Sequence, residues 1–505
     1  MASLYRMRKE NTMKIKFLAL LLSALMLLSC FAGCNEKQQK EVTEVGTDPT
    51  VTEEETVPDR TFADLARVDL QEEEFTILTR SDSNTNLWKP IDWMGTAEDT
   101  DDIPAAVFKR NTRVEETFNC TIKHVMDTAY LEEAQAAFMG DTEDYDIIVM
   151  PVIQQLGNMA ASGYYADLSA LSTLNLQDCW WDQKTNSSLS LLNHYYTLCG
   201  DIDVTDNRAT WCVFFNKVME SDYSLFNHYD AVENGTWTME TMFANAAEVD
   251  NENLGLTGIG TELFAYSAFL MGSGVRCFVK NEEDVPMNRM NNREVLEAVN
   301  SIYSYVQKKD LQMYGDDPVR YPELEGTNFG VLYKTFKNAS MLYCMGTLSN
   351  AVDPQISDAS FSYGILPVPK LSSAVSEYVS TFQGSNGTGV SILSNHDKKS
   401  DIGIVLEALS AASVDTLTPA FYDTTLMGRK VPDPDSSEML DIILNNREVD
   451  LGIVLSQQVR GILNDTFMTM SSFTFANNRA SYMQNLETNL EKIITDIRNN
   501  FVAQQ

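Results

Sequence analysis

Three apolar, strand-like segments alternate with three helix-like segments near the start of the chain, and this alternation constrains the fold more than any other feature. The strand-like segments are 74–80, 121–126 and 145–151, and the helix-like segments begin at Asp102 and cover 130–139 and 153–162. The third strand is a continuous apolar run, which is typical of a strand covered on both faces. Strand–helix alternation of this kind predicts an open α/β sheet with right-handed crossovers.

A hydrophobic leader precedes this region. Residues 17–28 form an apolar run of about a dozen residues behind two lysines, whereas a membrane-spanning helix needs about 20. The leader therefore predicts a secretory signal peptide over residues 1–33. The true start of the chain is either Met1 or Met13, since Met13-Lys-Ile-Lys is the more natural beginning of such a signal.

The leader ends in Phe31-Ala-Gly-Cys34, which resembles the lipobox of bacterial lipoproteins. The resemblance implies that Cys34 is acylated and anchors the protein, although Phe31 stands where the motif usually has Leu. Two alternatives remain open: modification of Cys30, or a simple cleaved signal with an incidental cysteine. Residues 34–60 are polar and lack large apolar side chains, so we expect a lipidated cysteine followed by a flexible linker.

Composition sets limits on the partners. The 505 residues include 37 basic and 72 acidic ones, for a net charge of −35, and such a surface repels nucleic acid and anionic lipid headgroups. The length is enough for two or more packed lobes. Behind Cys34 the six cysteines contain no Cys-x-x-Cys and the four histidines are scattered, so no metal and no cofactor are predicted. One or two disulfides among these cysteines remain possible.

Several motifs follow one another in the order found in a known family. They are Asp146-Ile-Ile-Val-Met-Pro151, Gly163-Tyr-Tyr-Ala-Asp-Leu168, Trp211-Cys-Val-Phe-Phe-Asn-Lys217 and Tyr363-Gly-Ile-Leu-Pro-Val-Pro-Lys370. Together they resemble the extracellular solute-binding proteins, family 1 type, of ABC transporters, which are lipoproteins in Gram-positive bacteria. The resemblance covers about residues 75–494. It implies an α/β, periplasmic-binding-protein-like type II fold with two lobes, several hinge crossings and a ligand cleft between the lobes.

The same resemblance implies a division of the chain into alternating lobe segments. We expect lobe 1 over 61–204, lobe 2 over 205–335, a return to lobe 1 over 336–385, and a return to lobe 2 with C-terminal helices over 386–505.

Ligands of open α/β sheets bind beyond the carboxyl ends of the strands, so polar and aromatic residues in loops after the predicted strands are the candidates. The predicted ligand-binding residues chosen on this ground are Arg80, Asp82, Trp88, Trp93 and Asp201. The family resemblance adds Tyr266, Phe269 and Arg276, which lie where the family often lines the cleft on the lobe 2 side, and Phe382 and Gln383 are included because they precede a glycine-rich stretch. Gly384–Gly389 is expected to be a flexible hinge or cleft rim.

Structural roles compete with these assignments. Asp201 and Asp203 suit solvated turns, and Trp237 suits packing at a helix start, with Thr238 as the N-cap. Trp180 and Trp181 would point to opposite faces of an extended segment, so at most one would touch a ligand. Trp88 and Trp93 lie in a polar loop with no obvious core to join.

The leading hypothesis is a monomeric protein on the extracellular face of the membrane, which captures a sugar or oligosaccharide and delivers it to the subunits of an ABC permease. Two alternatives remain: a surface carbohydrate-active enzyme, and a lipoprotein that reports ligand occupancy to a sensor kinase. The sequence has neither Gly-x-Ser-x-Gly nor His-Glu-x-x-His, so the hypothesis includes no catalytic residue.

Overall fold

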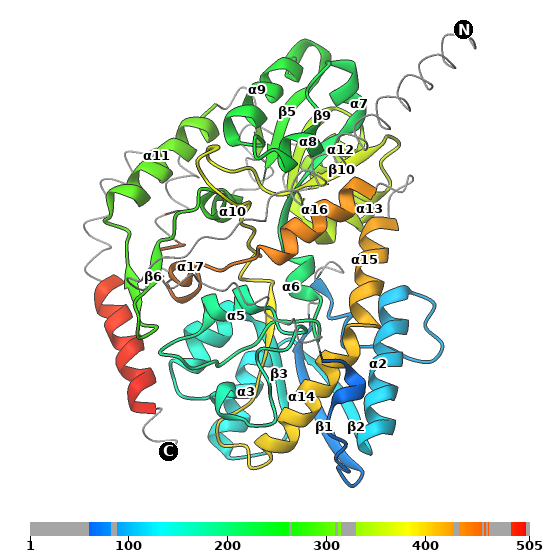
Figure 1. The fold of residues 1–505 in the computed structure, drawn as a ribbon, viewed down its shortest axis with the longest axis vertical. Helices are drawn as coiled ribbons and strands as arrows, with labels where there is room; N and C mark the ends of the chain where they lie inside the picture. The colour runs from blue at the N-terminus through cyan, green and yellow to red at the C-terminus, as the bar shows by residue number, and fades with distance from the viewer. Residues whose placement is uncertain are drawn as a thin grey trace, which may run out of the picture. The chain divides into compact units, whose positions relative to one another are not determined.

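The computed structural model describes residues 60–81, 88–261, 265–308, 312–314, 330–427, 434–456, 459–460, 463 and 486–500. All of them belong to one compact unit, Asp59–Gln505. The leader, Cys34, most of the linker and Asp82 lie outside the described residues. Two β-sheets of four and five strands organise this unit (Figure 1), and β6 (Phe278–Lys280) and β7 (Pro286–Asn288) form a small two-stranded sheet.

The first sheet contains the strands predicted near the start of the chain. Its strand order is β11-β3-β1-β2, where β1 pairs in parallel with β2 and β3, and β11 pairs antiparallel with β3. The strands are β1 Glu73–Arg80, β2 Cys120–Asp127, β3 Ile147–Pro151 and β11 Thr388–Ser391. All five residues of β3 are buried, as expected for an apolar strand in the middle of a sheet.

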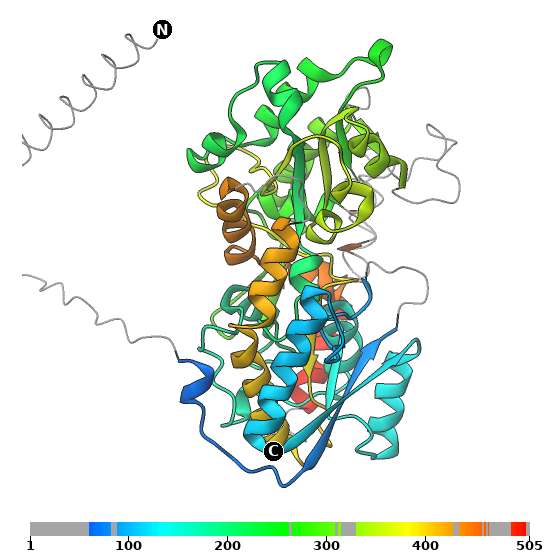
Figure 2. The same ribbon diagram turned by 90° about the vertical axis from the view of Figure 1, so that its right-hand side faces the viewer.

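Helices cover this sheet, among them the one predicted to begin at Asp102. In this helix, α2 (Asp102–Phe118), Ile103, Val107, Val114 and Phe118 are buried, and the helix ends in a left-handed C-cap at Asn119, whose φ is 52°. The helix α14 (Lys399–Ser413) packs against α2, and the two run side by side in both views (Figures 1 and 2). The remaining short helices of this half are α3 Tyr130–Gly140, α4 Val152–Gln154, the π-helix η3 Gln155–Ala160 and α5 Gln183–Leu189.

The second sheet has the order β10-β4-β9-β5-β8. The strands are β4 Trp211–Asn216, β5 Thr257–Thr261, β8 Gln312–Tyr314, β9 Met341–Thr347 and β10 Tyr363–Leu366. Strand β4 is antiparallel to both β9 and β10, whereas β5 is parallel to β8 and β9. Its helices are α7 Lys217–Asp222, α8 His228–Glu233, α9 Met239–Val249, α10 Tyr266–Gly272, α11 Arg293–Val306, α12 Gly330–Lys337, α13 Pro354–Ser357 and α16 Pro434–Asn445.

We call the first sheet with its helices lobe 1 and the second sheet with its helices lobe 2. Within the described residues the chain passes between them four times. The passages are α6 (Thr205–Arg208), residues 367–387, α15 (Leu417–Met427), and residues 446–450, which lead into α17 (Leu451–Leu455). We number these segments crossings one to four.

The expected division into returning segments is corrected by the strand pairing. Strands β9 and β10, which lie within 336–385, hydrogen-bond to β4 and so belong to lobe 2. Strand β11, in the segment assigned to lobe 2, pairs with β3 in lobe 1. The sheet to which a strand belongs is decided by hydrogen bonds to segments that are distant in the sequence. The apolar pattern of the strand itself does not indicate these partners.

Three tryptophans that were weighed as ligand contacts, Trp180, Trp181 and Trp237, are buried in the core. Trp237 is fully buried and its indole N–H donates to the Pro367 carbonyl at 2.8 Å, which is the predicted packing role. Trp180 and Trp181 do not point to opposite faces: both are buried, and both indole N–H groups donate to the carboxylate of Glu407. They lie in a tight turn, where the strand-like alternation of side chains does not apply.

The six described cysteines form no disulfide with one another, and five of them are buried while Cys179 is exposed. Within the described residues no single helix is long and apolar enough to cross a membrane. Only Lys399–Ser413 combined with Leu417–Thr425 passes that test, as a pair bent by 44°.

Candidate ligand-binding site

The carboxyl-terminal edge of the lobe 1 sheet brings together groups from three segments. Arg80 is the last residue of β1, Gln154 closes the short helix after β3, and residues 383–387 form a turn that leads into β11. This turn lies against the end of β3, because Val152 N–H donates to Gly387 O at 3.0 Å. Ligands of open α/β sheets bind at this edge, so these groups are the core of the candidate site.

Arg80 is held by the turn. Its guanidinium donates to the carbonyl of Ser385 and to the side-chain oxygen of Asn386, each at 3.1 Å. The Asn386 amide in turn donates to the side-chain oxygen of Gln383. Arg80, Gln383 and Asn386 are each only partly buried, so their polar atoms lie at the boundary with solvent. Guanidinium and amide groups placed in this way suit the oxygen atoms of a polar ligand.

The edge of the lobe 2 sheet meets the residues that directly precede this turn. We call residues 209–211 and 381–383 the strip. Trp211 begins β4 opposite Thr347, the end of β9, and its N–H donates to Thr381 O at 3.0 Å. Gln383 N–H donates to Ala209 O, also at 3.0 Å. Crossings one and two therefore run together between the two sheet edges. A solute held at this strip would touch both lobes.

Two glycines of this stretch, Gly387 in the turn and Gly389 in β11, are required by the close approach of neighbouring side chains. A Cβ atom at Gly387 would lie 2.2 Å from the ring of Phe382, and one at Gly389 would lie 2.4 Å from Thr197 Oγ1. Phe382 itself is buried. The expected cleft rim is thus a tightly packed turn that fixes Gln383 and Asn386.

Crossing one is fixed to lobe 1 by buried charges. The Asp92 carboxylate accepts from the N–H groups of Val204 and Thr205, both at 2.9 Å, and Arg110 donates to Ile202 O at 2.8 Å. Asp203 is buried rather than solvated. Its pKa is raised well above the ordinary value, by burial and by the neighbouring Asp92 carboxylate.

The other predicted ligand residues are spread over the structure. Trp93 is 2% exposed and has joined a core, with the Arg110 guanidinium 5.2 Å from its ring centre, which the polar loop did not indicate. Trp88 is half-buried, and Tyr266 and Phe269 on α10 are buried. Their roles in ligand binding stay predictions, as does that of Asp82, which lies outside the described residues.

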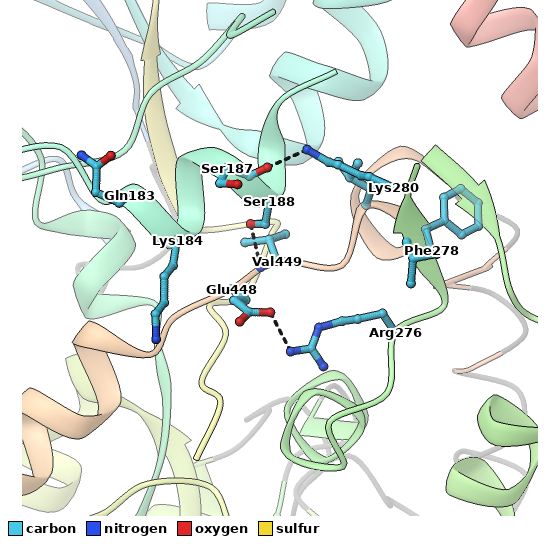
Figure 3. Close-up of a pocket in the computed structure, with 11 residues that line it drawn as sticks. Gln183, Lys184, Ser187, Ser188, Arg276, Phe278, Lys280, Glu448 and Val449 are labelled. Atoms are coloured by element: carbon cyan, nitrogen blue, oxygen red, sulfur yellow. Dashed lines mark hydrogen bonds and ion pairs between the residues drawn. The ribbon is translucent and has the colours of Figure 1, made fainter. Parts of the chain in front are cut away.

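Arg276 lines a separate cavity of about 510 Å³ (Figure 3). Its walls come from α5 of lobe 1, from β6 (Phe278–Lys280) after α10 of lobe 2, and from crossing four. Arg276 pairs with Glu448 at 2.8 Å, and Lys280 donates to Ser187 O at 2.6 Å. The cations of this cavity therefore already have protein partners.

Asp201 lines another cavity of about 360 Å³, together with the turn that contains Trp180 and Trp181. Burial raises the pKa of Asp201 to about 6, and Thr418 donates to its carboxylate at 2.8 Å. The structure thus brings Arg80, Phe382 and Gln383 together but places Asp201 and Arg276 elsewhere. Sequence reasoning missed Asn386, although it lies within the glycine-rich stretch that was singled out.

No protein-family model matches the sequence, and no curated protein matches it. Solved structures do match. The GacH receptor of Streptomyces glaucescens, solved unliganded and with acarbose, has a TM-score of 0.53 at 14% identity, covering 82% of this chain and 99% of its own. The chain has the type II solute-binding-protein fold.

Two further solved structures have a similar fold. The ABC substrate-binding protein Lmo0181 of Listeria monocytogenes, in complex with cycloalternan, has a TM-score of 0.52 at 12% identity and covers 85% of this chain and 99% of its own. UgpB of Mycobacterium tuberculosis, in complex with glycerophosphocholine, has a TM-score of 0.53 at 14% identity, with 83% and 99% covered. The fold predicted from the motif order is confirmed.

Proposed function

We propose that this chain is the solute-binding protein of an ABC transporter and captures a sugar or oligosaccharide between its lobes for delivery to a permease. One observation carries the proposal: the carboxyl-terminal edges of both sheets meet at the strip formed by residues 209–211 and 381–383. The solute-binding-protein fold supports it, and so do the acarbose and cycloalternan bound by two proteins of that fold.

Capture follows from the fold without a catalytic group. A solute bound at the strip contacts both lobes only when they are close, so binding shifts the population toward the closed arrangement. Arg80, Gln383 and Asn386 would supply hydrogen bonds to hydroxyl oxygens on the lobe 1 side. Trp88, half-buried in the loop after β1, would offer a ring face to a sugar.

A binding assay with product analysis tests the proposal. The full-length chain is incubated with maltotetraose and with cycloalternan, and thermal unfolding and chromatography are recorded on the same samples. A capture protein gains thermal stability by mass action while the glycan stays intact. Steady appearance of shorter glycans would show a carbohydrate-active enzyme instead, and no shift across a wider panel of sugars and polyols would contradict sugar capture.

Arg80→Ala tests the site. The substitution removes donors at the strand edge, so we expect a weaker thermal shift by the bound glycan. Loss of the bonds to Ser385 and Asn386 also makes the free chain slightly less stable, so the shift is measured relative to the free variant. Arg293→Ala is the matched control, because Arg293 is exposed on α11 and pairs only with nearby Glu297 at 2.6 Å among the described residues. Equal glycan affinity in both variants would remove Arg80 from the site.

The proposed location is the extracellular face of the membrane, with Cys34 as the lipid anchor. Cys34→Ala should release the protein from the membrane fraction, whereas Cys30→Ala should leave it bound. The opposite result would assign the anchor to Cys30, and release by neither would indicate another mode of attachment.

A further inference from the structure

Arg447 lies in crossing four and is almost fully buried, with 3% of its side chain exposed. Its guanidinium donates to Asp182 at 2.7 and 3.1 Å, to Asp206 at 2.7 Å and to the Asn207 amide oxygen at 2.6 Å. The guanidinium carbon lies over the Phe382 ring, 5.5 Å from the ring centre. A planar fork of donors used in this way tolerates little displacement of its partners.

The partners of Arg447 come from segments that are far apart in the sequence. Asp182 is the N-cap of α5 in lobe 1, where it also accepts from Thr185 N–H at 3.0 Å. Asp206 and Asn207 belong to crossing one, and Phe382 belongs to crossing two. Since Asp92 binds crossing one to lobe 1, the bonds of Arg447 fix crossing four to lobe 1.

The next residue holds the opposite lobe. Glu448 pairs with Arg276 at 2.8 Å, and Arg276 follows α10, the helix directly after β5 of the lobe 2 sheet (Figure 3). The backbone between these two side chains is itself pinned to crossing two, because Ser380 N–H donates to Asn446 O at 3.0 Å and Glu448 N–H donates to Ser380 O at 2.9 Å. Adjacent residues thus bind different lobes.

We propose that Arg447 is a positioning residue that, with Glu448, sets the resting angle between the two lobes. A change of that angle moves Arg276 relative to Asp182 and Asp206. Because Arg447 and Glu448 are adjacent in the chain, they cannot keep their bonds to both groups when these groups move apart. Without the guanidinium, Asp206 stays fully buried beside the Asp182 carboxylate with no cation between them, so the crossings separate. That this angle matters for solute capture rests on the proposed function. That Arg447 and Glu448 set the angle does not depend on the proposed function.

Distances between spin labels test this role without any ligand. Ketone-bearing unnatural residues replace Lys109 on α2 and Glu248 on α9, both exposed and in different lobes, so the native cysteines stay in place. Double electron–electron resonance on the full-length chain then reports the lobe-to-lobe distance distribution. Arg447→Gln and Glu448→Gln are compared with Arg113→Gln, which breaks an ion pair with Asp415 inside lobe 1.

We expect a displaced or broadened distribution for Arg447→Gln and Glu448→Gln, and the parent distribution for Arg113→Gln. The inference is overturned if Arg447→Gln unfolds cooperatively and yet keeps the parent distribution. If Arg447→Gln does not fold, Glu448→Gln decides, because Glu448 is 37% exposed and its loss leaves no buried carboxylate. If the chain bound no sugar, the proposed function would be refuted. The lobe-to-lobe distances of the parent and the variants would still test the role of Arg447.

Discussion

Glu407 on α14 provides a sharp test of buried electrostatics in lobe 1. Its carboxylate is buried and accepts from the indole N–H groups of Trp180 at 3.4 Å and Trp181 at 3.1 Å. Arg60, the last residue of the expected linker and the first one that the structure describes, lies 3.5 Å from it and pairs with Asp178. Burial, followed by the neighbouring Asp178, raises the pKa of Glu407 from 4.5 to about 7.

The sign of the resulting pH dependence follows from proton linkage. Between pH 4.5 and about 7 the folded chain keeps a proton on Glu407 that the unfolded chain has lost, so the free energy of unfolding falls as pH rises through this window. The difference between the two pKa values corresponds to about 3 kcal/mol in total. Of this, about 2 kcal/mol is lost between pH 5.5 and pH 8.

Glu407→Gln keeps an oxygen acceptor for the indoles and removes the titration. Urea unfolding at pH 5.5 and pH 8 should therefore show a smaller loss of stability in the variant, by about 2 kcal/mol. Asp201 and Asp206, whose pKa values are raised mainly by burial to about 6 and about 7, add the same slope to both proteins. Glu297→Gln, on an exposed helix face, controls for removing one charge. Equal pH slopes in variant and parent would refute the argument.

Two further predictions concern packing in lobe 2. Trp237→Ala removes a fully buried ring and its hydrogen bond to Pro367, so urea unfolding should show a loss of about 3–5 kcal/mol, and a loss below about 1 kcal/mol would contradict the burial. Gly364→Ala places a Cβ atom 2.2 Å from the Phe215 ring and should cost about 1–3 kcal/mol, whereas Gly140→Ala, whose Cβ atom meets nothing closer than 3.5 Å, should cost less in the same assay.

The elements of the first half were predictable because their apolar period is local. The strand predicted over 121–126 spans Cys120–Asp127, and the helix predicted over 130–139 ends one residue later. The helix predicted over 153–162 differs: it is a short α-helix followed by the π-helix Gln155–Ala160. The spacing of apolar residues does not determine which carbonyl each N–H selects, so this change of register was not visible in the sequence.

Only some residues of the candidate site could be predicted from the sequence. Arg80 was chosen because it follows a predicted strand and Gln383 because it precedes the glycine-rich stretch, and the two lie together at the sheet edge. The burial of Trp93 was not predicted, because its partner Arg110 lies on the following helix and nothing in the polar loop indicates that contact. Arg447 gave no signal, since its carboxylate partners are 241 and 265 positions away in the chain.

The dense charge at the crossings has a physical cause. A segment that leaves one sheet for another loses the ladder partners of its backbone groups, and buried N–H and C=O groups need replacements. Asp92 supplies acceptors for the N–H groups at the start of α6, and Arg110 supplies a donor for Ile202 O. Both side chains come from lobe 1, so crossing one moves with that lobe as far as Thr205. The bonds of Arg447 to Asp182, Asp206 and Asn207 extend this attachment to lobe 1, so any rotation of lobe 2 must be taken up beyond Asn207.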